Sequence, residues 1–243
     1  MNRRGFLAST GAVLSLGVAG RRAARRPDPV VVRVWFSDAA AAHEGLEARV
    51  EGYLGAALDA AGGGVEIDFA PSPVSLPAEG GRHVLAVHWP AKVVEGAVGV
   101  GRVDPVADVN LLVTDGDPRE QPAGYARPHV AAVTGAKYVA RMPPAAETPS
   151  VVPYSVRAAA TQLLLHEVGH ALGIGHEHGS ADRDGDAVVA SPMVGSYLWA
   201  SREVREKHVP DRNVCGGSLP GDRSTSERRL RLRYADCAVQ ALR

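Results

Sequence analysis

The residues of this chain best suited to chemistry lie in one histidine-rich segment, HEVGHALGIGHEHG, at 166–179. Its fourteen positions hold four of the nine histidines of the sequence, with two glutamates and four glycines. On a helix, His166 and His170 would lie one turn apart on the same face, as two ligands to a single ion require. The spacing therefore predicts a two-histidine metal clip.

Two further residues could turn this clip into a catalytic site. Glu167 lies about 100° around a helix from the first ligand, where its carboxylate can reach a water on the metal without becoming a ligand. Gly173 can take a left-handed conformation that ends the helix and turns the chain back. His176 can then approach the same ion. Three imidazoles leave one position of a tetrahedral zinc ion open, which is typical of catalytic zinc.

The segment 166–176 resembles the long zinc signature H-E-x-x-H-x-x-G-x-x-H of the metzincin metalloproteases. That family also has a methionine in a tight turn beneath the metal, and Met193 in SPMVGSY follows the third histidine by 17 residues. Without the signature, a methionine such as Met193 is more often a residue packed in the core. Beside the complete signature, we interpret it as the methionine of that turn.

The continuation HEHGSADRD is most similar to astacins, which have a glutamate after the third histidine and a nearby Asp-Arg-Asp. Here these are Glu177 and residues 182–184, but Ser180 and Gly195 depart from the astacin pattern. The family within the metzincins is therefore left open. Tyr197 is a candidate metal ligand or transition-state stabiliser, with a packed tyrosine as the favoured alternative.

The resemblance implies a zinc-dependent endopeptidase in which His166, His170 and His176 hold the ion. Glu167 would take a proton from the zinc-activated water and hand it to the leaving amine. Metzincins bind an extended substrate along an edge strand, expected here between about 108 and 133. Two alternatives use the same residues: a non-catalytic zinc-stabilised binding domain, which has no use for Glu167, and a zinc hydrolase of a non-peptide bond.

The pattern of apolar residues predicts the elements that position this site. The segment 155–172 is rich in alanine and leucine, which favours a helix that Gly173 ends. Apolar residues at helical spacing predict a second helix over 39–61, before three consecutive glycines. Strands are expected at 30–36, 65–70, 83–89, 108–114 and 136–142.

This order of elements predicts an α/β (α+β) fold, with helices on a mixed twisted sheet. We expect an N-terminal lobe at about 27–175 that contains the active-site helix. A small irregular C-terminal lobe, at about 176–243, would end in a helix at 226–242. This arrangement agrees with the metzincin-like zincin that the signature implies.

The first 26 residues have the composition of an export signal. Six arginines and no acidic residue occur there, around an apolar run from Phe6 to about Ala19 that is too short to span a bilayer comfortably. Arg3 and Arg4 before Gly-Phe-Leu resemble a twin-arginine signal; an ordinary secretory signal and an uncleaved anchor stay open. We expect a secreted or cell-envelope protein that contacts the membrane only through this segment, if it is uncleaved.

The charge of the remaining chain argues against a nucleic-acid partner. Outside residues 1–26 there are 21 basic residues, since 27 minus 6 leaves 21, against 27 acidic ones. Nucleic-acid binding requires a basic surface that neutralises phosphates. We therefore expect no nucleic-acid partner. The resemblance implies a protein or peptide substrate, and we expect a monomer.

The two cysteines, Cys215 and Cys237, would pair in an oxidising compartment and close a loop of 22 residues. The chain-entropy model gives such a bridge roughly 3 kcal/mol of stabilisation. Two unpaired thiols are the alternative.

The segment DRDGD at 182–186 resembles the start of a calcium loop, but its twelfth position is Met193 and not glutamate, so a solvated acidic turn is favoured over a calcium site.

The polar residues around the signature have simpler interpretations. Glu177 either pairs with an arginine or a processed N-terminus or is exposed, and His178 is expected at the surface. The other histidines lack ligand spacing and are expected to be structural: His43, His83, His88, His129 and His208.

Overall fold

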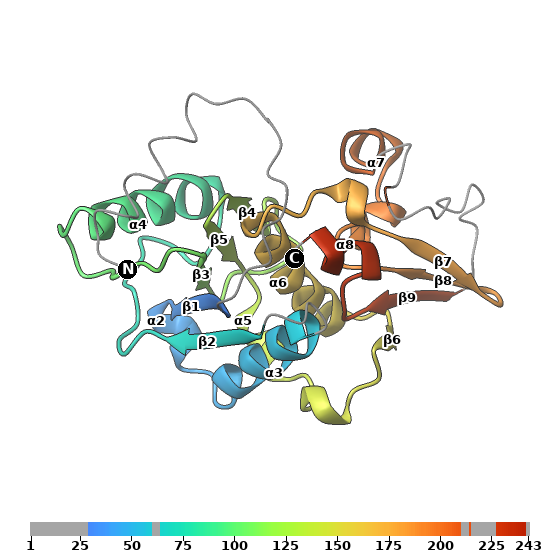
Figure 1. Cartoon of the computed structure of the whole chain (residues 1–243), viewed down its shortest axis with the longest axis horizontal. Coiled ribbons are helices and arrows are strands. Elements are labelled where there is room, and N and C mark those ends of the chain that lie inside the picture. Colours follow the sequence, from blue (N-terminus) through green and yellow to red (C-terminus); the bar gives the residue numbers. More distant parts are fainter. Residues whose placement is uncertain (1–28, 60–63, 210–213, 215–226, 242–243) are drawn as a thin grey trace.

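Two mixed β-sheets and several helices make up the protein in the computed structural model (Figure 1). The structure describes residues 29–59, 64–209, 214 and 227–241. The first sheet comprises β1 (Val30–Phe36), β2 (Val65–Phe69), β3 (Val109–Val113), β4 (Gly124–Arg127) and β5 (Val130–Val133). The second comprises β6 (Val151–Pro153), β7 (Ala181–Asp184), β8 (Ala187–Ala190) and β9 (Glu227–Arg231). The helices and helical turns are α2 (Asp38–Ala41), α3 (Leu46–Leu58), η3 (Val84–His88), α4 (Trp89–Ala97), α5 (Ala136–Ala140), η4 (Ala145–Glu147), α6 (Val156–Ala171), η5 (His176–His178), η6 (Gly195–Trp199), α7 (Arg202–His208) and α8 (Asp236–Ala241).

The first sheet has the order β2-β1-β3-β5-β4, with four parallel strands and β4 antiparallel at one edge. Strands β1, β2 and β3 confirm the predictions at 30–36, 65–70 and 108–114. The edge strand β4 falls within the range 108–133 that the sequence indicated for such a strand. The predicted α+β class is therefore correct.

Helices cover both faces of this sheet because alternate strand residues point to opposite sides. On one face, α3 and α6 pack against Val34 and Leu111 in the larger hydrophobic core. On the other face, α4 packs against Leu112 and Trp35, whose ring lies 5.2 Å from that of Trp89. Figure 1 shows α4 and α3 on opposite sides of the strands, and α6 between the two sheets.

The helix predicted over 39–61 is interrupted. It divides into α2 and α3, and Gly45 precedes α3 with a left-handed φ of 76°. Glycine adopts this conformation without the steric cost that a Cβ imposes. The break redirects the chain, so that α3 buries Val50 and Leu54 against the sheet.

Two predicted strands are wrong. Residues 83–89 form the π-helical turn η3 and the start of α4, because Leu85, Trp89 and Val93 continue a buried face at helical spacing. This segment has four consecutive apolar residues between two histidines, and such a short run fits a strand and a buried helix equally well. Residues 136–142 contain α5, which follows Gly135 at a φ of 100°. The short strands β4 and β5 occupy the sheet instead.

The predicted irregular C-terminal lobe contains most of a second sheet, with the order β6-β9-β8-β7. The helix predicted at 226–242 is also wrong over its first half, which is β9, although α8 does follow it. Leu230, Leu232 and Tyr234 are all buried, at a spacing of two residues. This period of two indicates a strand and was the signal that the helix prediction overlooked.

The acidic segment 182–186 forms an exposed hairpin between β7 and β8. Asp182 accepts from Arg231 at 3.1 Å, and Asp184 accepts from Arg229 at 2.9 Å. These aspartates thus pair with arginines of β9.

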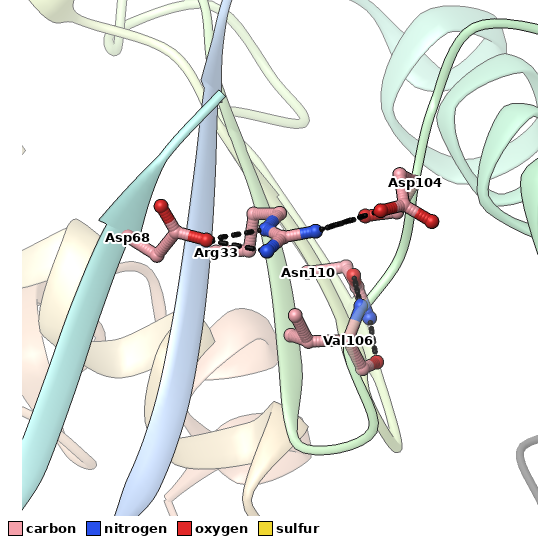
Figure 2. A network of polar contacts seen from close by, with 5 residues as sticks. All are labelled: Arg33, Asp68, Asp104, Val106 and Asn110. Atoms are coloured by element: carbon pink, nitrogen blue, oxygen red, sulfur yellow. Dashed lines mark hydrogen bonds and ion pairs between the residues drawn. The ribbon is translucent and has the colours of Figure 1, made fainter. Parts of the chain in front are cut away.

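A polar network ties the loop before β3 to the first sheet (Figure 2). Arg33 Nε donates to Asp68 Oδ2 at 2.7 Å, and its Nη1 donates to the carbonyl of Asp104, also at 2.7 Å. Asn110 accepts from the amide of Val106 and donates to its carbonyl, at 2.8 and 2.9 Å. The side chains of β1 and β3 therefore hold this loop in place.

Several predictions fall partly outside the described residues. The proposed export signal at 1–26 and Cys215 both lie there, while Cys237 is disulfide-bonded. Within the described part of the chain, no helix has the length and apolar character needed to cross a membrane.

Candidate metal centre

Helix α6 carries the first half of the histidine segment and has well-defined ends. The Ser155 hydroxyl caps its start by accepting from the amide of Ala158 at 3.1 Å. Beyond its last turn, Gly173 takes a left-handed φ of 91°, and Ile174 N donates to the carbonyl of Gly169 at 2.9 Å. The predicted helix at 155–172 is confirmed, and the chain turns back after it as the glycine indicated.

The rings of His166, His170 and His176 converge on one point. Their Nε2 atoms are 3.1 Å apart for His166 and His170, 3.0 Å for His170 and His176, and 3.3 Å for His166 and His176. An ion bound tetrahedrally at about 2.0–2.1 Å from each nitrogen would separate its ligands by about 3.3 Å. The three histidines thus form a cluster that could hold a metal ion.

Backbone carbonyls fix the orientation of two of these rings. His166 Nδ1 lies 2.7 Å from the carbonyl of Pro192, and His170 Nδ1 lies 2.9 Å from that of Ile174. A carbonyl can only accept, so each Nδ1 carries the hydrogen and each Nε2 presents its lone pair. Burial lowers the pKa of His166 to about 3 and of His176 to about 4, and also lowers that of His170. All three rings are therefore neutral near pH 7, as metal ligation requires.

Glu167 lies beside the cluster, between α6 and the edge strand β4. The residue is only 5% exposed, and burial raises its pKa to about 8. Its carboxylate is packed over Gly124, where any side chain on β4 would collide with it. A neighbouring cation would favour the ionised carboxylate and oppose this shift.

Met193 occupies a tight turn under the helix. The amides of Val194 and Gly195 donate to the carbonyl of Ser191 at 3.2 and 2.8 Å, and Met193 is 1% exposed. A Cβ added to Gly169 would lie 2.7 Å from the Met193 sulfur. The methionine thus supports the helix between the two ligands that α6 supplies.

Tyr197 and His208 form an aromatic wall on the open side of the cluster. The Tyr197 ring lies 5.6 Å from the rings of both His166 and His176. His208 stacks on Tyr197 at 4.5 Å and lies 5.6 Å from His176. The sequence interpretation of His208 as a structural residue missed this position, because the separate helix α7 brings it there and its spacing carries no signal.

The remaining polar candidates lie outside the convergence point. Glu177 contacts His178 at 3.4 Å and folds over Gly175. His43 pairs with Asp115 at 2.8 Å. Neither carboxylate joins the cluster.

A hollow of about 710 Å³ opens beside His166. It runs along α6 and is bounded by β4, η6 and α7; among its lining residues are Gly124, Gln162, Leu163, Tyr197, Val204 and His208. A slightly larger hollow of about 770 Å³ lies near Arg33 and Lys92, away from the histidines. Because converging ligand atoms adjoin only the first of these two, we take it as the functional cleft.

Comparison with known proteins identifies no family for this chain. No protein-family model, curated protein or solved structure matches the chain. Its function is therefore argued from the geometry of the site.

Proposed function

We propose that this protein is an exported zinc-dependent endopeptidase with the active-site arrangement of metzincins. The observation that carries the proposal is the convergence of three histidine Nε2 atoms within 3.0–3.3 Å of one another. Glu167 follows the first of these histidines in the chain, and its side chain packs against Gly124 of the edge strand β4. The proposal includes substrate cleavage, export and a monomeric state. Fractionation of the cells that produce the protein tests whether it is exported.

The donor set supports zinc. Three neutral imidazoles suit zinc, and an open fourth position is typical of a catalytic ion. A bound zinc ion would lower the pKa of a water and polarise the substrate carbonyl. His166, His170 and His176 would hold it, with the carbonyls of Pro192 and Ile174 keeping two of the rings in place.

The chain's own residues support the remaining steps of peptide hydrolysis. Glu167 is placed to accept a proton from water and to return it to the leaving nitrogen. Strand β4 is an edge strand, so its free side can pair with an extended peptide. In this proposal Tyr197, whose ring lies 5.6 Å from those of His166 and His176, would donate a hydrogen bond from its hydroxyl to the carbonyl oxygen as charge develops there.

The environment of Glu167 favours catalysis over a purely structural zinc site. Burial is the only cause of its raised pKa, and no charged or hydrogen-bonding group in the described part of the chain offsets it. Burying a carboxylate in this way costs stability. A domain that needs zinc only for its fold would gain nothing from this residue.

The test compares the full chain with its Glu167→Ala variant, using a mixture of denatured proteins as substrate and measuring zinc in both. We expect one zinc per chain in each, chelator-sensitive cleavage by the parent and a loss of at least about 100-fold in the variant. Glu177→Ala is the matched control, because it removes an exposed carboxylate beside the third ligand. Zinc binding without cleavage by the parent would favour the binding-domain alternative, and absence of zinc would overturn the site.

A further inference from the structure

Gln162 lies one helical turn before His166 on the same face of α6, and its amide orientation is fixed. Its Nε2 donates to the carbonyl of Ala190 and to that of Arg231, at 2.9 Å in each case. Both partners are carbonyls and can only accept, so the amino group must face them. The Gln162 Oε1 therefore points the other way.

That oxygen faces the cleft beside His166. Gln162 and Gly195 both line this hollow, and Oε1 lies 3.4 Å from where a Cβ on Gly195 would be. Gln162 is only 2% exposed, and within the described residues no donor pairs with its Oε1. The Oε1 atom is not fully buried, so a group in the cleft can reach it. A ligand that supplied a donor there would satisfy this acceptor.

The walls of the cleft indicate what carries that donor. Apolar side chains from α6, the preceding segment and α7 line the same cleft as Gln162: Tyr154, Val156, Ala159, Leu163 and Val204. Among the described residues that line it there is no aspartate or glutamate, whereas Arg119, His166 and His208 do belong to it. A charged lysine or arginine would find no counter-ion there, so the walls favour a neutral donor on a large apolar body.

We propose that the cleft binds the side chain of a tyrosine or tryptophan next to the cleaved bond. The aromatic ring lies against the apolar wall of α6, and its O–H or N–H donates to Gln162 Oε1. This inference rests on the proposed endopeptidase function, since it names the substrate class of the same site. Gln162 is then a specificity-determining residue.

The experiment uses pairs of peptides that differ only in tyrosine or phenylalanine next to a single cleavable bond. One measurement is kcat/KM with the zinc-loaded parent, and the other is equilibrium binding to the zinc-loaded Glu167→Ala variant, which needs no turnover. In both we expect tyrosine to be preferred over phenylalanine by roughly 2- to 12-fold, the range for one neutral hydrogen bond. Gln162→Leu should reduce this ratio to about one.

The ratio is taken within each variant, so a loss of folded protein caused by Gln162→Leu cancels. Ala159→Phe provides a second test, because it fills the cleft while leaving Gln162 unchanged, and it should weaken binding of both peptides. The inference would be overturned if the parent cleaved and bound the two peptides equally well. It would also be overturned if Gln162→Leu left the tyrosine-to-phenylalanine ratio unchanged. Cleavage without a tyrosine preference would contradict this inference but not the endopeptidase function. Selective binding of the tyrosine peptide without cleavage would contradict the endopeptidase function but not the binding preference.

Discussion

At the scale of single residues, Gly169 illustrates how closely the histidine-bearing helix α6 is packed. It lies between His166 and His170, and a Cβ there would approach the Met193 sulfur to 2.7 Å and a Tyr234 ring carbon to 3.2 Å. Both neighbours are buried, so neither can yield without disturbing the core. The glycine thus allows the helix to contact the methionine turn.

Gly169→Ala should therefore lower the free energy of unfolding by roughly 1–3 kcal/mol through overpacking, and should weaken metal binding by shifting the two histidines. Urea unfolding and metal titration measure these effects. Gly55→Ala is the control, since it also lies within a helix but has no heavy atom within 4 Å of its added Cβ. It should stabilise the protein by about 0.5–1 kcal/mol. Equal effects of the two substitutions would contradict the packing argument.

The ligand residues could be predicted from the sequence because they are close together along the chain. His166 and His170 share one helix face, and Gly173 marks the turn toward His176. The amide orientation of Gln162 and the position of His208 could not be predicted, because they depend on contacts made by β9 and α7. Such tertiary contacts leave no local period in the sequence.

At the scale of elements, the start of α6 determines where the histidines lie along the helix. Ser155 has extended backbone geometry, and its hydroxyl accepts from the amide of Ala158, which would otherwise lack a partner in the first turn. The preceding strand, β6, holds this end against β9. The cap therefore joins the second sheet to the histidine-bearing helix α6.

Ser155→Ala should reduce the free energy of unfolding by about 1 kcal/mol, as measured by urea denaturation, because the Ala158 amide loses its acceptor. Ser155→Asp should retain most of the stability, since aspartate also caps helices. A similar loss in both variants would show that packing of the serine matters more than its hydrogen bond.

Elements with a uniform composition were more predictable than mixed ones for a physical reason. Helix α6 is rich in alanine and leucine, and strand β1 is a run of β-branched and aromatic residues, so composition alone indicates each of them. The segment 83–89 and the strand β9 are short, so a few residues fit either period until burial is known. The second sheet also joins β6 to strands far along the chain, and sequence patterns do not specify such pairings.

At the scale of the whole molecule, we expect the fold to form without a bound metal. Three hydrophobic clusters, distributed over both sheets and their helices, account for the core. Among the described residues, the metal-binding cluster contributes only three side chains, and two of these rings already have carbonyl partners. Metal binding should add stability to a structure that exists without it.

Removal of the metal with a chelator should abolish hydrolysis and lower Tm, while far-UV circular dichroism at room temperature changes little. Added zinc should restore both activity and Tm. The shift in Tm should increase with the free zinc concentration, since binding to the folded state stabilises it by mass action. Loss of the circular dichroism signal on chelation would instead indicate a zinc-dependent fold.

The position of β9 sets the order in which a growing chain can assemble this molecule. Strand β9 lies between β6 and β8, yet it follows both of them in synthesis. On the ribosome, α6 is synthesised long before Arg231 and Tyr234. The Arg231 carbonyl later accepts a hydrogen bond from Gln162 of α6, and the Tyr234 hydroxyl donates one to the carbonyl of Leu165. Closing such distant contacts is slow compared with forming a helix. The histidine helix therefore reaches its final support only after the chain has been made as far as Tyr234.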